Sequence, residues 1–94
     1  MSRTIIKLDK RLDLLASAPL AAGILEHSGQ DLELDASDVE HIGALAVQVM
    51  RAAAKSWAAS GHDLALADPT EDCAQQLAIL GYAPETVTLW EGGE

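Results

Sequence analysis

The chain of 94 residues contains no phenylalanine, only three aromatic side chains and a single cysteine. Its apolar content, 49% of all residues, consists mainly of alanine and leucine, so we expect a small aliphatic core. A core of this kind leaves little room for an enclosed substrate cavity. The length predicts one globular domain over residues 1–94.

Basic residues are also scarce. Six Lys and Arg stand against 15 Asp and Glu, which gives a formal net charge of −9. This charge repels phosphate backbones and anionic lipid headgroups, so we expect neither nucleic-acid binding nor membrane-surface binding. It suits a basic protein partner, although the same charge also serves to keep a small domain in solution.

Several kinds of site are missing from the sequence. Cys73 has no partner for an internal disulfide, and its position on an apolar helix face predicts a core residue. The three histidines are too scattered to form a zinc-type ligand pair, so we expect no metal and no cofactor. Neither a glycine-rich phosphate loop nor a nucleophile motif occurs, which predicts a protein that is not an enzyme. Without an apolar run of signal-peptide or membrane-span length, the expected location is the cytoplasm.

The first elements follow from hydrophobic patterning. Residues 4–8 are β-branched and apolar, and residues 11–14 alternate between polar and apolar after a short turn, which predicts an antiparallel hairpin. Ser17 as N-cap and Pro19 in the first turn predict a helix over residues 18–28.

The middle of the chain predicts a strand over residues 31–35 and, after a polar segment, a long helix. Apolar residues recur at helical spacing from Ile42 to Trp57, and the helix is expected to end near Ser60 and Gly61. The polar face of this helix carries Gln48, Arg51 and Lys55.

The last third predicts a strand over residues 63–67 and a helix that begins at Asp68-Pro69-Thr70. The buried stripe expected for this helix consists of Cys73, Leu77 and Leu80, with Gly81 closing the helix. Residues 86–90 have strand composition, and residues 91–94 are expected to fray. The predicted order is β-β-α-β-α-β-α-β. It indicates an α/β fold with a mixed, mostly parallel sheet covered by helices.

Residues 34–49 (LDASDVEHIGALAVQV) resemble the centre of STAS domains, the family of bacterial anti-sigma-factor antagonists. There, a strand ending in Asp or Asn leads to an Asp-Ser-Ser/Thr-Gly-Leu signature that opens the second helix. Further similar stretches are residues 12–13, 18–20, 61–66, 68–70 and 77–82. The resemblance covers nearly the whole chain and implies a STAS-like domain that acts by binding another protein.

The sequence departs from the family at this signature. Counted back from Gly61 without gaps, the signature falls on residues 43–46, and a slip by two places it on residues 41–44. Neither register contains a hydroxyl group. In the family, a partner kinase phosphorylates the serine or threonine here, and Ala44 occupies the equivalent position, so this switch is excluded.

The resemblance also implies a contact surface on the loop before the second helix and on its first turns. The predicted partner-binding residues are Asp38, Glu40, His41, Gly43, Ala44, Gln48 and Arg51. The small residues at the helix start expose backbone amides and a flat apolar surface, but they equally suit tight helix packing. His41 is either a pH-sensitive contact or simply an exposed side chain.

Three functions are compatible with the resemblance. The first is signalling, as an anti-sigma-factor-antagonist-like or chemotaxis-cluster protein that binds a kinase-type regulator. The second is an MlaB-like soluble subunit that docks on the ATPase or permease of an ABC transporter for lipid. The third is binding of a small ligand or nucleotide, which the acidic surface and the missing phosphate loop disfavour.

Overall fold

The computed structural model describes residues 4–90 of the chain, so the expected fraying of residues 91–94 lies outside the described residues. The elements are β1 (Thr4–Lys7), β2 (Arg11–Leu12), α1 (Leu14–Leu25), β3 (Leu32–Asp35), β4 (His41–Ile42), α2 (Ala44–Ser60), β5 (Leu64–Ala67) and α3 (Glu71–Ile79).

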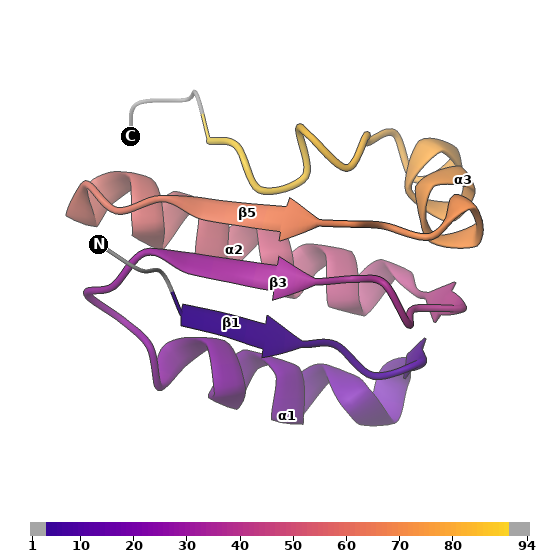
Figure 1. Cartoon of the computed structure of the whole chain (residues 1–94), viewed down its shortest axis with the longest axis horizontal. Helices are drawn as coiled ribbons and strands as arrows, with labels where there is room; N and C mark the ends of the chain where they lie inside the picture. The colour runs from indigo at the N-terminus through magenta and orange to yellow at the C-terminus, as the bar shows by residue number, and fades with distance from the viewer. Residues whose placement is uncertain (1–3, 91–94) are drawn as a thin grey trace.

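All strand pairs in the described part of the chain are parallel. β1, β3 and β5 form one sheet with β3 in the centre, and β2 pairs with β4 in a separate two-stranded sheet. Figure 1 shows α1 and α2 behind the three-stranded sheet and α3 beyond the carboxyl end of β5. The side chains of Leu32 and Leu34 on the central strand are fully buried. This arrangement confirms the predicted α/β class with parallel strands.

Helix α2 supplies much of the core. Its buried residues are Ala46, Val47, Met50, Ala53, Ala54 and Trp57. The indole N–H of Trp57 donates to the carbonyl of Gln30 at 2.8 Å, which satisfies its polar atom inside the core. Gly61 ends the helix in the left-handed region (φ 76°), where glycine is favoured. The predicted long helix is confirmed, and it begins at Ala44.

The predicted antiparallel hairpin is wrong. β1 pairs with β3, whereas β2 pairs with β4, so the two strands enter different sheets. Leu8 and Leu12, on either side of the expected turn, are both buried in the core. The chain therefore crosses from one sheet to the other where a turn was expected, because both leucines must be buried.

The predicted start of the first helix is also wrong. α1 begins at Leu14, and its N-cap is Asp13, whose Oδ1 accepts from the Ala16 N–H at 3.2 Å. Ser17 is buried one turn into the helix and donates its hydroxyl to the Asp13 carbonyl at 3.0 Å. Aspartate and serine are both good N-caps. Here Asp13 caps the helix, and Ser17 lies inside it and bonds back to the Asp13 carbonyl.

Three expectations for the rest of the chain need correction. Residues 86–90 form no strand: residues 84–88 are a turn, in which the Thr86 hydroxyl accepts from the Ala83 N–H at 2.9 Å and the Val87 N–H donates to the Ala83 carbonyl at 2.9 Å. These local bonds outweigh the β-branched composition.

The polar segment that precedes the long helix was expected to contain no strand, but it ends in the short strand β4. Leu80 is exposed instead of belonging to the buried stripe.

Candidate functional site

The start of α2 is held by backbone contacts rather than by tight side-chain packing. The Gly43 N–H donates to the carbonyl of Leu12 at 2.9 Å, which joins the N-cap to β2. A Cβ at Gly43 would lie 3.5 Å from that carbonyl oxygen, an ordinary contact distance. Ala44 is exposed, whereas Ala46 is fully buried. Packing in the core therefore accounts for the small side chain of Ala46 but not for the small residues Gly43 and Ala44. These two small residues leave a flat surface at the helix start.

Helix α3 is fastened beside this surface by two side chains. The Oε1 of Gln76 accepts from the Ile42 N–H at 2.8 Å, and its Nε2 donates to the Glu40 carbonyl at 3.0 Å. The Thr70 hydroxyl donates to the Val39 carbonyl and also accepts from the Cys73 N–H at the helix start. The carboxyl end of α3 is thereby held next to the first turns of α2.

Two adjoining hollows separate these helices, and we call them together the α2–α3 groove. Its lining residues are His41, Ile42, Gly43, Ala44, Val47, Gln48, Arg51, Gln76, Ile79, Leu80 and Tyr82. Ala44 and Leu80 line both hollows. Ile79 is 83% exposed and Leu80 37% exposed, and Leu45 on the first turn of α2 is exposed as well. The groove is therefore an open, mainly apolar surface.

Arg51 closes one end of the groove. Its Nη1 donates to the carbonyls of Thr86 and Val87 at 3.0 and 3.1 Å, and also to the carbonyl of Leu89. The guanidinium lies 5.2 Å from the ring centre of Tyr82 and 5.1 Å from that of Trp90. These contacts tie residues 83–90 to α2, so Arg51 anchors the C-terminal segment as well as lining the groove.

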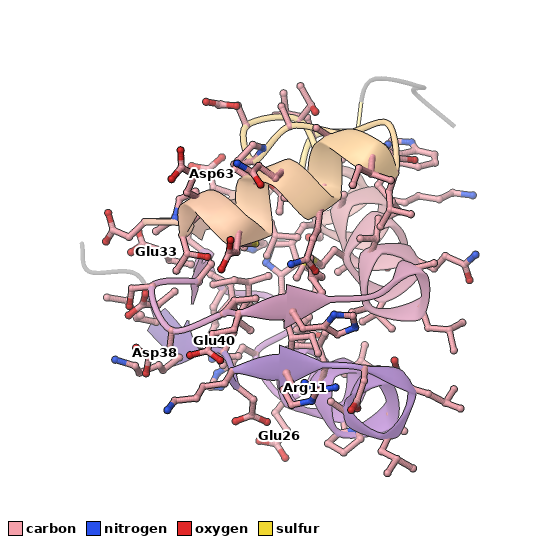
Figure 2. The ribbon with its side chains drawn as sticks, turned by 90° about the vertical axis from the view of Figure 1, so that its right-hand side faces the viewer. Arg11, Glu26, Glu33, Asp38, Glu40 and Asp63 are labelled. Carbon is pink, nitrogen blue, oxygen red and sulfur yellow. The ribbon has the colours of Figure 1, made fainter. Side chains whose placement is uncertain are left out.

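The predicted partner-binding residues do not form one cluster. His41, Gly43, Ala44 and Gln48 line the groove, with Arg51 at its end. Asp38 instead forms an ion pair with Lys7 at 3.5 Å, beyond the carboxyl end of β1. Figure 2 shows Asp38 and Glu40 on the same side of the molecule as Glu33 and Asp63. Glu40 contributes its backbone carbonyl to the Gln76 contact, while its side chain is exposed.

Two titratable groups stabilise the frame around the groove. The Ser37 N–H donates to Asp35 Oδ1 at 2.9 Å, and this bond, with the Ser37 hydroxyl and the nearby Lys7 ammonium, lowers the pKa of Asp35. This contact shapes the turn between β3 and β4. Cys73 is buried in α3, and burial raises the pKa of its thiol. The thiol therefore stays neutral at physiological pH, as expected of a core residue.

Four residues of this site were not predicted from the sequence: Thr70 as a contact to the loop, and Gln76, Ile79 and Leu80 as groove residues. The bonds of Gln76 span 34 and 36 positions along the chain, so no local pattern identifies them. The sequence does contain an indication that Ile79 or Leu80 is exposed. Two adjacent apolar residues at the end of a short helix lie on different faces, so one helix face cannot bury both.

Between residues 4 and 90, His, Cys, Asp and Glu side chains nowhere gather in a group of three or more that could hold a metal ion. Within that same range, each helix is too short or too polar to cross a bilayer.

A family model for the STAS domain matches residues 2–91. Neither the comparison with curated proteins nor that with solved structures gave a match. The family match covers nearly the whole chain and agrees with the parallel strands and three helices described above. The chain therefore belongs to the STAS domain family, whose members serve in general as protein-interaction and regulatory modules.

Proposed function

We propose that this protein binds a kinase-type regulator in bacterial signalling, through the α2–α3 groove. The observation that carries the proposal is the pair of exposed apolar side chains that line the groove, Ile79 and Leu80, beside a helix start made of small residues. Exposed apolar groups that surround a flat surface are typical of the centre of a protein–protein contact. Anti-sigma kinases and chemotaxis components are the regulators we expect.

The chemistry of the groove favours a protein over a nucleotide. A phosphate group binds most strongly where cationic side chains are free to turn toward it. The one guanidinium that lines the groove already donates to backbone carbonyls and lies 5.2 and 5.1 Å from the centres of two aromatic rings. The remaining lining is mostly apolar or uncharged, with His41 at one end.

The proposed contact is not switched by phosphorylation at the start of α2, the family's usual site. Residues 38–48 contain no serine, threonine or tyrosine, and Ala44 stands at the start of α2. Incubation with the captured kinase, followed by mass spectrometry, is therefore expected to find no phosphate within residues 38–48. A phosphate located there would contradict the assignment of Ala44 to the family's phosphorylated position.

The partner itself is tested by capture from the native cell. Tagged wild type, Ala44→Asp and Ala58→Asp are incubated with the soluble and the membrane fractions, and the bound proteins are identified by mass spectrometry. Ala44 and Ala58 are both exposed, at opposite ends of α2. The helix dipole favours aspartate at position 44, at the amino-terminal end, and disfavours it at position 58, near the carboxyl end. Loss of the partner with Ala44→Asp alone therefore cannot result from weakening of the helix.

We expect a soluble kinase or chemotaxis component that binds wild type and Ala58→Asp but not Ala44→Asp. Capture of an ABC transporter by wild type and Ala58→Asp, but not by Ala44→Asp, would support docking at the groove and contradict the signalling role. Equal capture by all three proteins would place the contact outside the groove.

A further inference from the structure

Helix α1 is apolar on all sides. None of its twelve residues, LLASAPLAAGIL, is charged. One face carries the buried residues Ser17, Leu20 and Ile24. On the opposite side, Leu14 is 70% exposed, Leu15 85% and Leu25 63%. A surface helix normally carries polar residues on its outer face, and one that is apolar all round is normally buried.

The exposed apolar residues of α1 form one continuous stripe, which we call the α1 face. It consists of Leu14, Leu15, Ala18, Pro19, Ala22 and Leu25, all of them exposed. At helical spacing, the two alanines lie along the middle of the stripe and the leucines flank them. Small residues between larger ones allow a second helix to approach closely, with ridges packed into grooves.

Opposite charges stand at the two ends of this face. Arg11 precedes α1, and its side chain is 69% exposed. Its Nε lies 3.8 Å from Oδ2 of Asp13, with which it forms an ion pair. Glu26 follows α1 directly and is exposed. Figure 2 shows both residues on the side of the molecule occupied by α1. Glu26 is therefore open to a partner, and Arg11, although it pairs with Asp13, has further exposed N–H donors that can also bind a partner's carboxylate.

A second copy of the chain fits these features. If two α1 helices pack antiparallel, Arg11 of each copy lies beside Glu26 of the other, and the apolar stripes cover each other. A parallel arrangement would instead place Glu26 of one copy beside Glu26 of the other. Antiparallel packing is also what a twofold axis across the helix produces, and twofold dimers are the commonest homo-oligomers.

We propose that the chain forms a homodimer in which two α1 faces pack antiparallel about a twofold axis. α1 packs against α2, and Figure 1 places it on the other side of α2 from α3. The α2–α3 groove therefore stays open in the dimer, which presents two docking sites. This proposal does not depend on the partner proposed above.

The first test is sedimentation equilibrium of the full chain over a range of concentrations. One chain has a mass of 9.9 kDa, and we expect twice that mass for wild type and the mass of one chain for Leu15→Glu. Leu15 lies in the first turn of α1, where the helix dipole favours a carboxylate, so the variant is expected to stay folded by circular dichroism. Ile79→Glu is the matched control. Ile79 is equally exposed (83%) but lines the groove, so this variant should remain a dimer.

Charge exchange tests the antiparallel direction. We expect Glu26→Arg to weaken the dimer, and Arg11→Glu combined with Glu26→Arg to restore it, because the pairs reform with their signs exchanged. A double variant no stronger than Glu26→Arg would overturn the antiparallel arrangement. A wild type that sediments as one chain at every concentration, or a Leu15→Glu variant that remains a dimer, would overturn the interface. Binding of monomers to vesicles of zwitterionic lipid through Leu15 would also overturn it, in favour of a lipid surface.

Discussion

The side-chain amide of Gln76 binds the backbone of Ile42 as a neighbouring strand would: its Oε1 accepts from the Ile42 N–H at 2.8 Å. The same amide donates to the carbonyl of Glu40 at 3.0 Å. One side chain of α3 therefore bonds to the backbone on either side of His41, the first residue of β4. The position of α3, and with it the α2–α3 groove, depends on this contact. Exposed Ile79 ends the same helix three residues after Gln76, and exposed Leu80 follows as the C-cap.

Removal of this amide should loosen the groove. Gln76→Ala leaves the Ile42 N–H without its partner, and a partly buried unsatisfied donor costs about 1–3 kcal/mol. We expect this loss in the free energy of unfolding measured with denaturant. Gln75→Ala is the matched control, because Gln75 is exposed, and its effect should stay within about 0.5 kcal/mol. Equal effects of the two variants would contradict the role of Gln76.

Arg51 is expected to control the C-terminal segment. Lysine keeps the charge but lacks the planar fork that bonds several carbonyls and stacks on rings. Arg51→Lys should therefore speed hydrogen exchange of the Val87 and Leu89 amides and lower stability by about 1–2 kcal/mol. Lys55→Ala is the control, since its ammonium lies 5.7 Å from the Trp90 ring and such an exposed contact contributes about 0.5–1 kcal/mol. An equal increase in exchange with Lys55→Ala would contradict the anchoring role.

The turn after β3 predicts a pH dependence. The Ser37 N–H and hydroxyl, with Lys7, hold the pKa of Asp35 below its usual value. A lowered pKa in the folded state contributes stability above the unfolded pKa, about 3.9, and this contribution is lost as pH falls through the folded value. NMR titration of Asp35 should show the lowered pKa in wild type. Ser37→Ala should move it part of the way back, because the backbone N–H remains, whereas Ser28→Ala should leave it unchanged.

The thiol of Cys73 should be unreactive in the native protein. It is fully buried, and burial raises its pKa, so little thiolate is present at neutral pH. We expect slow reaction with a thiol reagent in buffer and fast reaction in denaturant. Fast reaction of the native protein would mean that α3 leaves the core readily.

The elements that local chemistry determines were predictable from the sequence. The strand at residues 32–35 follows from alternation, and Asp68-Pro69-Thr70 predicts the start of α3 at its N-cap Thr70. The long helix follows from its apolar spacing, with its end at Gly61. In each of these cases, the residues that determine the element lie within the element or beside it.

Features that depend on distant contacts were not predictable. β2 and β4 contain two residues each, and their pairing joins Arg11 to His41 across the chain. The segment after Pro84 has strand composition, but its carbonyls bind Arg51 and its chain forms a turn. At the site, the sequence identified the start of α2 through Gly43 and Ala44. It missed the α3 side of the groove, because nothing near Gln76 in the sequence indicates its partners.

The most direct measurement of the central claim is the affinity of the captured partner for two variants, Ile79→Glu and Leu15→Glu. Both replaced side chains are almost fully exposed, one in the α2–α3 groove and one on the α1 face. Titration calorimetry should give an affinity about tenfold weaker or more for Ile79→Glu, at least about 1.4 kcal/mol, because a carboxylate must then be buried at an apolar contact. Leu15→Glu should bind each partner molecule as wild type does. Unchanged affinity of Ile79→Glu would contradict docking at the groove.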